Sequence, residues 1–483
     1  MNAPSLDVSL QGAFAPVDME TAATDLPVIG KLPEDLNGLY VRNGPNPRFT
    51  PIGRYHWFDG DGMLSAIRFD QGRASFKSRW VQTDGLGEEL AAGRPLWRGL
   101  KEKQRLDRPD QPLKNTSNTD VKFHAGQLLS SWYRGGDVYR CDPYSLATLG
   151  KLQPDSRLKG LPISSHSRVD ERTNEYIFFA YGNEAPYMHY GVIGADGALK
   201  NFTPIPLPGP RLPHDMAITE HYSILHDFPL MNDPKALAEG RYRLNFHRDM
   251  PSRFAVIPRH GSASDVRWFE ATPRYMLHVV NAWEEGDELV MRGTPYSIQR
   301  RFDGSHDFEA YERGIAMNAT DFEFYEWRFN LRTGATSEQI VDDVYNAEFP
   351  TINARLQGLP SRYSYHILMG RMRRPEDQRF AGLVKFDGKT GSGVAYNPGG
   401  DAWFSEAPFA PRDGASGEDD GYIVSFVWNA RESRSETWVL DARDISRGPV
   451  CRVVLPQRVP NGFHATWVSE ARLSGSSAAL GQA

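Results

Sequence analysis

Short runs of apolar and aromatic residues recur along most of the chain, with polar residues between them. Three clear examples cover residues 63–69, 176–180 and 422–428. Apolar residues at every second position, over four to eight residues rich in Ile, Val, Phe, Tyr and Trp, are typical of β-strands. The pattern therefore predicts a chain built mainly from short strands.

Clusters of Asp, Asn, Gly and Pro separate these predicted strands. Such residues favour tight turns, so each cluster is interpreted as the tip of a hairpin. The clearest clusters cover residues 141–143, 170–174, 195–197, 332–334, 387–391 and 441–444. Helices are expected only in two insertions, residues 85–93 and 231–240, which would form a small cap over one face.

No long Gly/Ser linker or block of like charges divides the chain. We therefore expect one domain over residues 25–470, preceded by an extension (residues 1–24) and followed by a flexible tail (residues 471–483). An all-β domain of this size must protect many strand edges, and a ring of four-stranded blades does so. At about 40 to 60 residues per blade, the chain predicts a seven-bladed β-propeller, with a large β-sandwich as the alternative.

Composition and charge narrow the classes of function. Hydrophobic residues make up 40% of the chain and charged residues 24%, as in a folded globular protein. The net charge of −6 argues against nucleic-acid binding, which requires clustered positive charge. The two cysteines, Cys141 and Cys451, are too few for a disulfide framework or a thiolate zinc site, so a cytoplasmic location is expected. No signal peptide or membrane-spanning segment is found, although an apolar patch that contacts a membrane peripherally is compatible with the sequence.

Four histidines share a distinctive setting, at or near the start of an apolar strand: His166, His214, His278 and His464. The gaps between them are 48, 64 and 186 residues, or about one, one and three to four blades. In a propeller the inner strands of all blades meet at the axis, where four neutral imidazoles could bind Fe, Cu, Ni or Zn. Taken singly, however, each such histidine is more often an ordinary core residue.

A histidine bound to a metal usually donates its other ring N–H to an acceptor that fixes its orientation. Glu348 and Glu406, each flanked by apolar residues, are candidates for this role. Other histidines stand in polar or mixed contexts and are expected at the surface without a chemical role: His56, His124, His189, His221, His247, His260, His306 and His366.

Several motifs resemble one known family, the carotenoid cleavage oxygenases. They are residues 36–47 (LNGLYVRNGPNP), 58–63 (FDGDGM), 115–119 (NTSNT) and 348–350 (EFP), together with the four histidine segments in the same order. The resemblance extends from about residue 32 to residue 468. Members of this family cleave apocarotenoids, stilbenes or phenylpropenes, and one is a retinoid isomerase.

The resemblance implies a seven-bladed propeller with a helical dome and Fe(II) held by the four histidines. It further implies that Glu348 orients His278, that Glu406 orients His464, and that Thr119 crowds a remaining iron position and limits competing water. The activity that it implies is that of a dioxygenase, which cleaves a non-ring C=C bond into two carbonyl products with O₂. The chain shows no nucleotide-binding fingerprint and no cysteine motif for an iron–sulfur cluster, so O₂ is expected as the only co-substrate.

The chain departs from the family pattern after the predicted strand 127–132. Relatives carry a glutamate there that supports the histidine corresponding to His214, whereas this chain has Tyr133 and Arg134. Either the Tyr133 hydroxyl, a water molecule or Asp137 takes the N–H of His214, or this ligand is held more loosely.

The same region bears on the substrate. Relatives that cleave stilbenes or isoeugenol carry a Lys-Glu pair here and a tyrosine about thirty residues earlier, and this chain lacks both, with Leu100 near the tyrosine position. The resemblance therefore favours an apocarotenoid or another long apolar alkene, bound by the aromatic residues Phe58, Trp97 and Tyr133. A stilbene or phenylpropene is the alternative.

Two hypotheses from other classes remain open at this stage. The segment His247-Arg248-Asp249 has the spacing of a facial-triad iron oxygenase, although its arginine content suggests an exposed turn. A propeller that binds a partner without catalysis is the second hypothesis, supported only by the missing glutamate. A monomer or a weak homo-oligomer is expected in either case.

Overall fold

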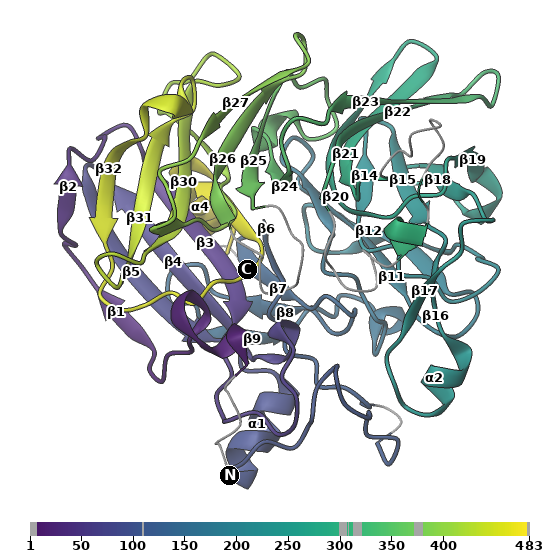
Figure 1. Ribbon diagram of the computed structural model, residues 1–483, viewed down its shortest axis with the longest axis horizontal. Helices are drawn as coiled ribbons and strands as arrows, with labels where there is room; N and C mark the ends of the chain where they lie inside the picture. The colour runs from purple at the N-terminus through teal and green to yellow at the C-terminus, as the bar shows by residue number, and fades with distance from the viewer. Residues whose placement is uncertain are drawn as a thin grey trace.

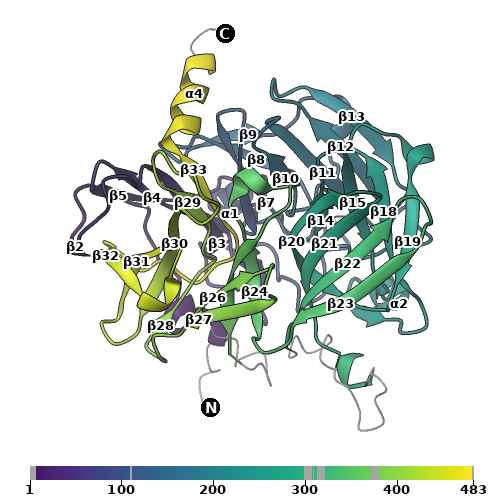
Figure 2. The same cartoon turned by 90° about the horizontal axis from the view of Figure 1, so that it is seen from above.

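Seven antiparallel sheets are arranged as blades around a central axis (Figures 1 and 2). The computed structural model describes residues 7–108, 111–298, 307, 309–312, 321–370 and 380–480, with side chains as far as residue 475. Each blade has four to six strands, and one separate two-stranded hairpin accompanies them. The predicted seven-bladed β-propeller is confirmed, and the β-sandwich alternative is wrong.

The innermost strand of each blade borders the axis. Neighbouring inner strands contact one another around most of the ring, for example β6 with β10 and β33 with β6. In chain order the inner strands are β6 (Asp120–His124), β10 (Arg168–Asp170), β14 (Met216–Ile218), β20 (Met276–Glu285), β24 (Ala347–Thr351), β29 (Phe409–Pro411) and β33 (Ala465–Ser469).

The first five blades are built from consecutive strands that run outwards from the axis. Their remaining strands are β7 (Gln127–Ser131), β8 (Tyr139–Cys141) and β9 (Thr148–Lys151); β11 (Glu175–Tyr181), β12 (Met188–Ile193) and β13 (Leu199–Pro204); β15 (Tyr222–Asp227), β18 (Ser252–Pro258) and β19 (Arg267–Ala271); β21 (Glu288–Pro295), β22 (Phe324–Asn330) and β23 (Thr336–Asp342); and β25 (Tyr363–Met369), β26 (Phe380–Asp387) and β27 (Ser392–Tyr396).

The last two blades combine strands from both ends of the chain. One contains β28 (Ala402–Trp403), β30 (Gly421–Asn429), β31 (Arg434–Asp441), β32 (Pro449–Val454) and β2 (Val28–Gly30), with β29 pairing to β30. The other runs from β33 through β3 (Gly38–Pro45), β4 (Gly62–Asp70) and β5 (Arg73–Trp80) to β1 (Thr21–Ala23). The ring is thus closed by β33 on β3 and by β32 on β2, and the expected boundary at residue 24 falls between β1 and β2.

The three example strands are confirmed as β4, β11 and β30, but their burial differs from the simple alternating picture. Almost every residue of these strands is buried, because each blade packs against a neighbouring blade on both faces. Outer strands such as β23 are the ones with many exposed positions. The predicted turns all lie between consecutive strands or directly after one, as expected of hairpin tips.

Helices are few, and two of them lie in the predicted insertions. Helix α1 (Asp84–Ala92) begins after Thr83, whose side chain accepts from the backbone of Leu86. Helix α2 (Pro234–Ala238) occupies part of the second insertion, which begins instead with β16 (Leu230–Asn232) paired to β17 (Leu244–Phe246).

Short 3₁₀ segments near the amino terminus lie beside the axial opening: η1 (Val8–Leu10), η2 (Gly12–Phe14) and η3 (Trp57–Asp59). Helix α4 (Glu470–Leu480) occupies residues for which a flexible tail was expected, and it projects on the opposite side of the molecule (Figure 2). Cys141 and Cys451 are both buried and free.

Candidate metal centre

Four histidine side chains from four blades converge on the propeller axis. His166 and His214 lie two residues before β10 and β14, His278 lies within β20, and His464 directly precedes β33. None of the four is more than 6% exposed, and neighbouring ring centroids are 4.4–5.2 Å apart. The structure therefore brings together all four histidines that the sequence singled out.

The ring nitrogens are close enough to share one metal ion. One nitrogen from each of His166, His214 and His278 lies within 4.8 Å of the other two, and Nε2 of His214 is 3.4 Å from Nε2 of His278. His464 lies outside this group of three, but its ring centroid is 4.6 Å from that of His278 and 4.7 Å from that of His166.

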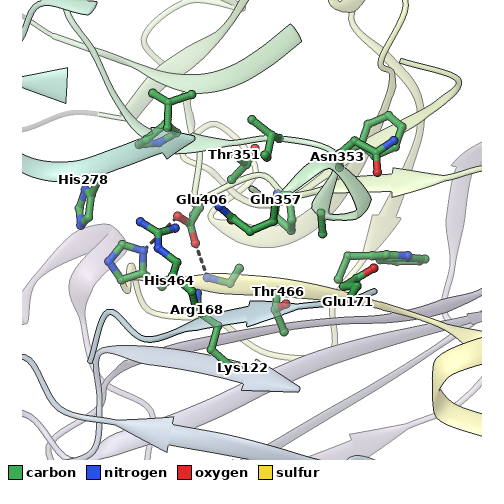
Figure 3. Close-up of a pocket in the computed structure, with 18 of the residues that line it drawn as sticks. Lys122, Arg168, Glu171, His278, Thr351, Asn353, Gln357, Glu406, His464 and Thr466 are labelled. Carbon is green, nitrogen blue, oxygen red and sulfur yellow. Dashed lines mark hydrogen bonds and ion pairs between the residues drawn. The ribbon is translucent and has the colours of Figure 1, made fainter. Parts of the chain in front are cut away.

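Two glutamates from neighbouring blades orient two of the imidazoles. Nδ1 of His278 is 2.7 Å from a carboxylate oxygen of Glu348. Nδ1 of His464 is 3.0 Å from a carboxylate oxygen of Glu406, and Figure 3 shows this second pair. The second oxygen of Glu406 accepts from the backbone N–H of Ala465, which fixes the carboxylate. Because Nδ1 of each ring is hydrogen-bonded to a glutamate, Nε2 is the nitrogen that faces the site. This is the usual arrangement of a histidine ligand with an acid behind it.

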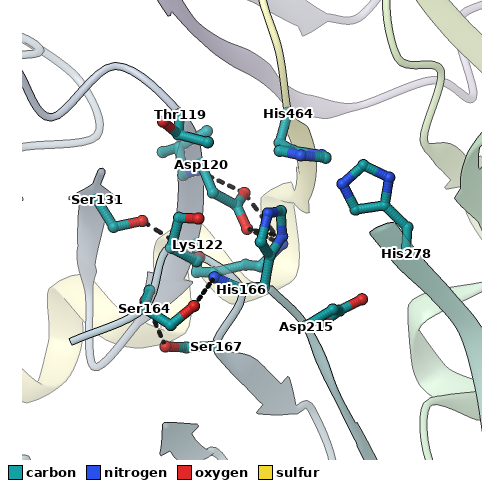
Figure 4. Close-up of polar contacts among 12 residues, drawn as sticks. Thr119, Asp120, Lys122, Ser131, Ser164, His166, Ser167, Asp215, His278 and His464 are labelled. Carbon is teal, nitrogen blue, oxygen red and sulfur yellow. Dashed lines mark hydrogen bonds and ion pairs between the residues drawn. The ribbon is translucent and has the colours of Figure 1, made fainter. Parts of the chain in front are cut away.

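Asp120 is a third acid at the centre that the sequence analysis missed. It opens β6 and lies 4.0 Å from Nδ1 of His166 (Figure 4). Lys122 pairs with the same carboxylate at 2.8 Å. Its position in the sequence could have indicated this role, because Asp120 stands at the start of an apolar strand, and the four histidines also stand at or near strand starts.

His214 has no acid behind it. Its Nδ1 is buried without a hydrogen-bond partner among the described residues. The Tyr133 hydroxyl lies 2.6 Å from that of Tyr242, and Asp137 pairs with Lys151 at 2.8 Å, so neither supports His214 and both proposed substitutes are wrong. The backbone of His214 is in the left-handed region (φ 63°), which costs about 1–2 kcal/mol for a non-glycine residue.

Burial and the neighbouring acids decide the charge of the site. Burial, together with the other imidazoles, holds the pKa values of His166 and His214 well below the ordinary value. Burial acts against protonation of His464 too, but the charge and hydrogen bond of Glu406 raise its pKa. The pKa of Glu348 is lowered despite burial, because His278 and further hydrogen bonds stabilise its carboxylate.

This donor set fits a divalent transition metal. Nε2 of His166 is buried without a hydrogen-bond partner among the described residues, which is costly unless a ligand occupies that position. Neutral imidazoles bind Fe, Cu, Ni and Zn, and the acids behind them are the usual outer partners of such ligands. The arrangement is that of a metal site with four histidine ligands.

Thr119 lines the same cavity as the four imidazoles, and its carbonyl accepts from the backbone N–H of His464 at 3.1 Å. Its hydroxyl donates to Asn118 (2.9 Å) and accepts from the backbone N–H of Tyr133 (2.9 Å). Figure 4 shows this hydroxyl on the side of Thr119 that is turned away from His464. The side chain therefore adds no polar ligand atom to the centre.

A large, mainly apolar cavity ends at the imidazoles. Its volume is about 1050 Å³, and its lining includes all four histidines, Thr119, and aromatic residues of the segments that cover this side of the propeller. Phe58 and Tyr133 belong to this lining, with ring centroids 4.7 Å apart. Phe58 and Tyr133, which were expected to contact the substrate, therefore line the cavity that ends at the imidazoles.

Trp97 is not among the residues that line this cavity. It lines a smaller neighbouring pocket, where its indole N–H donates to the Gln111 carbonyl at 3.2 Å. The guanidinium of Arg108 lies 4.9 Å from its ring centroid. Leu100 and Phe58 line both cavities, so they stand between Trp97's pocket and the apolar cavity.

Only some of the histidines that were expected at the surface are exposed. His124 and His366 are buried, because the strands that carry them pack between blades, and His226, which the sequence analysis passed over, is buried as well. His306 lies outside the described residues. His247 and Asp249 lie in an exposed turn and line neither the apolar cavity nor the pocket of Trp97, so the facial-triad hypothesis is wrong.

Every helix in the described ranges is too short or too polar to cross a membrane.

Comparisons with known proteins agree with this arrangement. A family model described as retinal pigment epithelial membrane protein, RPE65, matches residues 14–469. A carotenoid 9,10(9',10')-cleavage dioxygenase of Crocus sativus is 36% identical, over 96% of this chain and 89% of the relative.

Solved structures are similar over nearly the whole chain. A lignostilbene dioxygenase of Pseudomonas brassicacearum superimposes with a TM-score of 0.83 at 28% identity, covering 96% of this chain and 99% of that one. A variant of the Synechocystis apocarotenoid oxygenase gives 0.81 at 26% identity, covering 94% and 97% of the two chains.

Proposed function

Because this chain belongs to the family of RPE65 and the carotenoid cleavage oxygenases, we propose that it is an Fe(II)-dependent dioxygenase that cleaves a non-ring C=C bond of an apocarotenoid or a similar long apolar alkene. The family assignment makes it an alkene-cleaving dioxygenase rather than a non-catalytic propeller. The observation that carries the proposal is the meeting of four imidazoles with the inner end of the apolar cavity.

Fe(II) is the proposed cofactor, held by His166, His214, His278 and His464. When bound, it supplies the activation of O₂. Glu348 and Glu406 hold two of the rings in place through their Nδ1 atoms, so that Nε2 of each ring points inwards. Cleavage of one C=C bond into two carbonyl groups consumes both atoms of O₂ and no reductant, in keeping with a chain that shows no cofactor motif for electron supply.

The apolar cavity supports a long substrate. Its volume of about 1050 Å³ slightly exceeds the roughly 300–1,000 Å³ typical of cavities that enclose a drug-sized ligand. Phe58, Tyr133 and Phe463 form an aromatic wall near the histidines, with Phe58 contacting both other rings. Such walls hold a polyene by contact and exclude water from the reacting bond, while Thr119 presents no free hydroxyl there.

A stilbene or phenylpropene is a second candidate substrate, favoured by one observation. The hydroxyls of Tyr133 and Tyr242 lie 2.6 Å apart on the cavity wall, and the guanidinium of Arg134 lies 4.2 Å from the ring centroid of Tyr242. Two hydroxyls that share one hydrogen bond leave one hydrogen free to donate. This pair is therefore suited to an oxygen substituent on an aromatic ring, with the Arg134 guanidinium against the Tyr242 ring but outside the lining of the cavity.

The experiment is aerobic incubation of the Fe(II)-loaded protein with apocarotenals, stilbenes and phenylpropenes, followed by mass spectrometry of the products. We expect two carbonyl products from apocarotenals, each labelled when ¹⁸O₂ is used and the products are trapped before exchange with water. Label in only one product, or a requirement for added reductant, would refute the dioxygenase mechanism. Turnover of stilbenes or phenylpropenes alone would select the second candidate.

A further inference from the structure

A second cavity reaches the same imidazoles from the other side of the propeller. Its volume is about 140 Å³, and His166, His278 and His464 line it as well as the apolar cavity. His214 and Thr119 line the apolar cavity but are not part of this one. The four-histidine centre therefore lies between two cavities.

The exposed lining of the second cavity is mainly polar, although apolar residues such as Val279, Ile352 and Phe409 contribute to it. Figure 3 shows Lys122, Arg168, Asn353, Gln357 and Thr466 around it, together with the His464–Glu406 pair. The cations are balanced by nearby acids, as Arg168 pairs with Asp215 at 2.5 Å and Lys122 with Asp120 at 2.8 Å. We call this space the polar cavity.

The polar cavity extends from the imidazoles to the surface of the protein. Ala354 and Arg355, in the 3₁₀ segment η6 (Ala354–Leu356), belong to its lining and are exposed. At the inner end, Asp120 and Glu406 offer carboxylate oxygens directly beside the histidines. The lining of the polar cavity thus includes both exposed residues and three of the four histidines.

The two cavities differ in what they can admit. A hydrated divalent cation gives up its water only where other oxygen or nitrogen ligands replace it, and moving a charge through apolar surroundings is very costly. Most of the exposed lining of the apolar cavity is aromatic or aliphatic, with polar side chains such as Asp7, Ser9 and Gln11 in its amino-terminal segment, whereas polar groups, among them amides, hydroxyls and carboxylates, make up most of the exposed lining of the polar cavity. A long alkene has the opposite preference.

We propose that the metal ion reaches the four histidines through the polar cavity, as a hydrated divalent cation, while the alkene enters only through the apolar cavity. Oxygen atoms of the lining replace water in the shell of the ion, and Asp120 and Glu406 receive it next to His166 and His464. This inference rests on the metal site of the proposed function and is independent of the cleavage reaction.

The first test uses charge at the two openings. Arg355→Glu makes the outer end of the polar cavity more negative, and Lys101→Glu makes the same change of charge in the lining of the apolar cavity. Apoprotein is mixed anaerobically with Fe(II) for set times, quenched with chelator and desalted, and its bound iron is measured by atomic emission.

At low ionic strength we expect Arg355→Glu to take up iron on the order of threefold faster, with the difference lost in high salt, because attraction at an entrance accelerates association of an ion. Lys101→Glu is expected to match the unmodified protein. Equal acceleration by both variants, or acceleration by Lys101→Glu alone, would overturn the proposal.

The second test fills each cavity. Thr466→Trp and Gln357→Trp narrow the polar cavity at two separate elements, and Leu244→Trp narrows the apolar one. We expect the two polar-cavity variants to take up iron at least about tenfold more slowly but to reach the same final iron content, with Leu244→Trp unchanged in rate. Uptake at the native rate by a folded Thr466→Trp or Gln357→Trp variant contradicts the route.

The failure of this inference differs from a failure of the proposed function. If the unmodified protein binds no iron at equilibrium, the metal site of the proposed function is wrong. If it binds iron, but neither the charge variants nor the tryptophan variants affect the rate of iron uptake differently for the two cavities, the metal site stands and only the route is wrong.

Discussion

Replacing Glu348 by Gln tests whether the charge of the acid behind His278 matters, apart from its hydrogen bonds. Glu348 is buried, and one of its oxygens accepts from Nδ1 of His278 (2.7 Å) and from the backbone N–H of Phe349. Its other oxygen accepts from the Thr294 hydroxyl at 2.8 Å. Its lowered pKa means that this group is ionised at neutral pH.

The structure allows Gln to keep this network. The amide oxygen can take the place that accepts from His278 and Phe349, which leaves the amide NH₂ facing Thr294. The Thr294 hydroxyl can then accept from it and donate instead to the His278 carbonyl, from which it lies 3.2 Å. Glu348→Gln therefore removes the charge while every hydrogen bond is retained, whereas Glu348→Ala leaves the N–H of His278 without an acceptor.

We expect Glu348→Gln to weaken iron binding by about 10-fold, at the lower end of the 10- to 100-fold typical of such outer partners. This corresponds to about 1.4 kcal/mol of binding free energy. The thermal stability of the apoprotein should stay near that of the unmodified chain. Glu348→Ala should lose more iron affinity and about 1–3 kcal/mol of folding stability, because a buried donor is left unpaired.

The assay is anaerobic competition for Fe(II) against a chelator of known affinity, with calorimetry of the apoproteins. Iron affinity of Glu348→Gln equal to that of the unmodified protein would show that the charge is irrelevant. Loss of stability by Glu348→Gln as large as that by Glu348→Ala would show that the Thr294 hydroxyl does not rearrange as the geometry permits.

Three further outcomes are expected. His214→Ala should lose most bound iron while circular dichroism shows an intact propeller, because blade packing does not depend on this side chain, and full retention of iron would exclude it as a ligand. Tyr133→Glu should tighten iron binding by up to about tenfold by giving Nδ1 of His214 an acceptor, whereas Asp137→Asn should leave iron binding unchanged; a strong effect of Asp137→Asn would reverse this assignment. Phe58→Ala should raise KM for the alkene several-fold, and Trp97→Phe should not, since only Phe58 lines the apolar cavity; an equal rise for both would place Trp97 at the substrate.

Strand positions and turns could be predicted because they are local properties of the sequence. The period-two pattern located β4, β11 and β30, and Asp-rich turns marked the hairpin tips. The pattern could not reveal that blades pack on both faces, since burial of the second face depends on a neighbour distant in the sequence. His124 and His366 were assigned to the surface for this reason.

The metal ligands were predictable from their common place at the start of inner strands, together with the family resemblance. Asp120 stands at the start of a strand, as the histidines do, but a single aspartate at a strand end is most often solvated, and only the fold places it near His166. Trp97 was expected at the substrate as one of several aromatic residues that the resemblance favoured, but it lines the smaller neighbouring pocket instead. Which way a loop side chain points is decided by packing, which the sequence does not display.

Closure of the ring has a consequence for the chain during its synthesis. His464 directly precedes β33, and β33 pairs along its length with β3, from Gly38 opposite Ser469 to Arg42 opposite Ala465. A nascent chain that still lacks β33 already carries the other three histidines, but its first and last blades are unjoined. Because contacts so distant along the chain form late, the fourth imidazole is positioned only when the ring is complete. The complete set of four imidazoles is thus assembled only in a chain whose ring is closed.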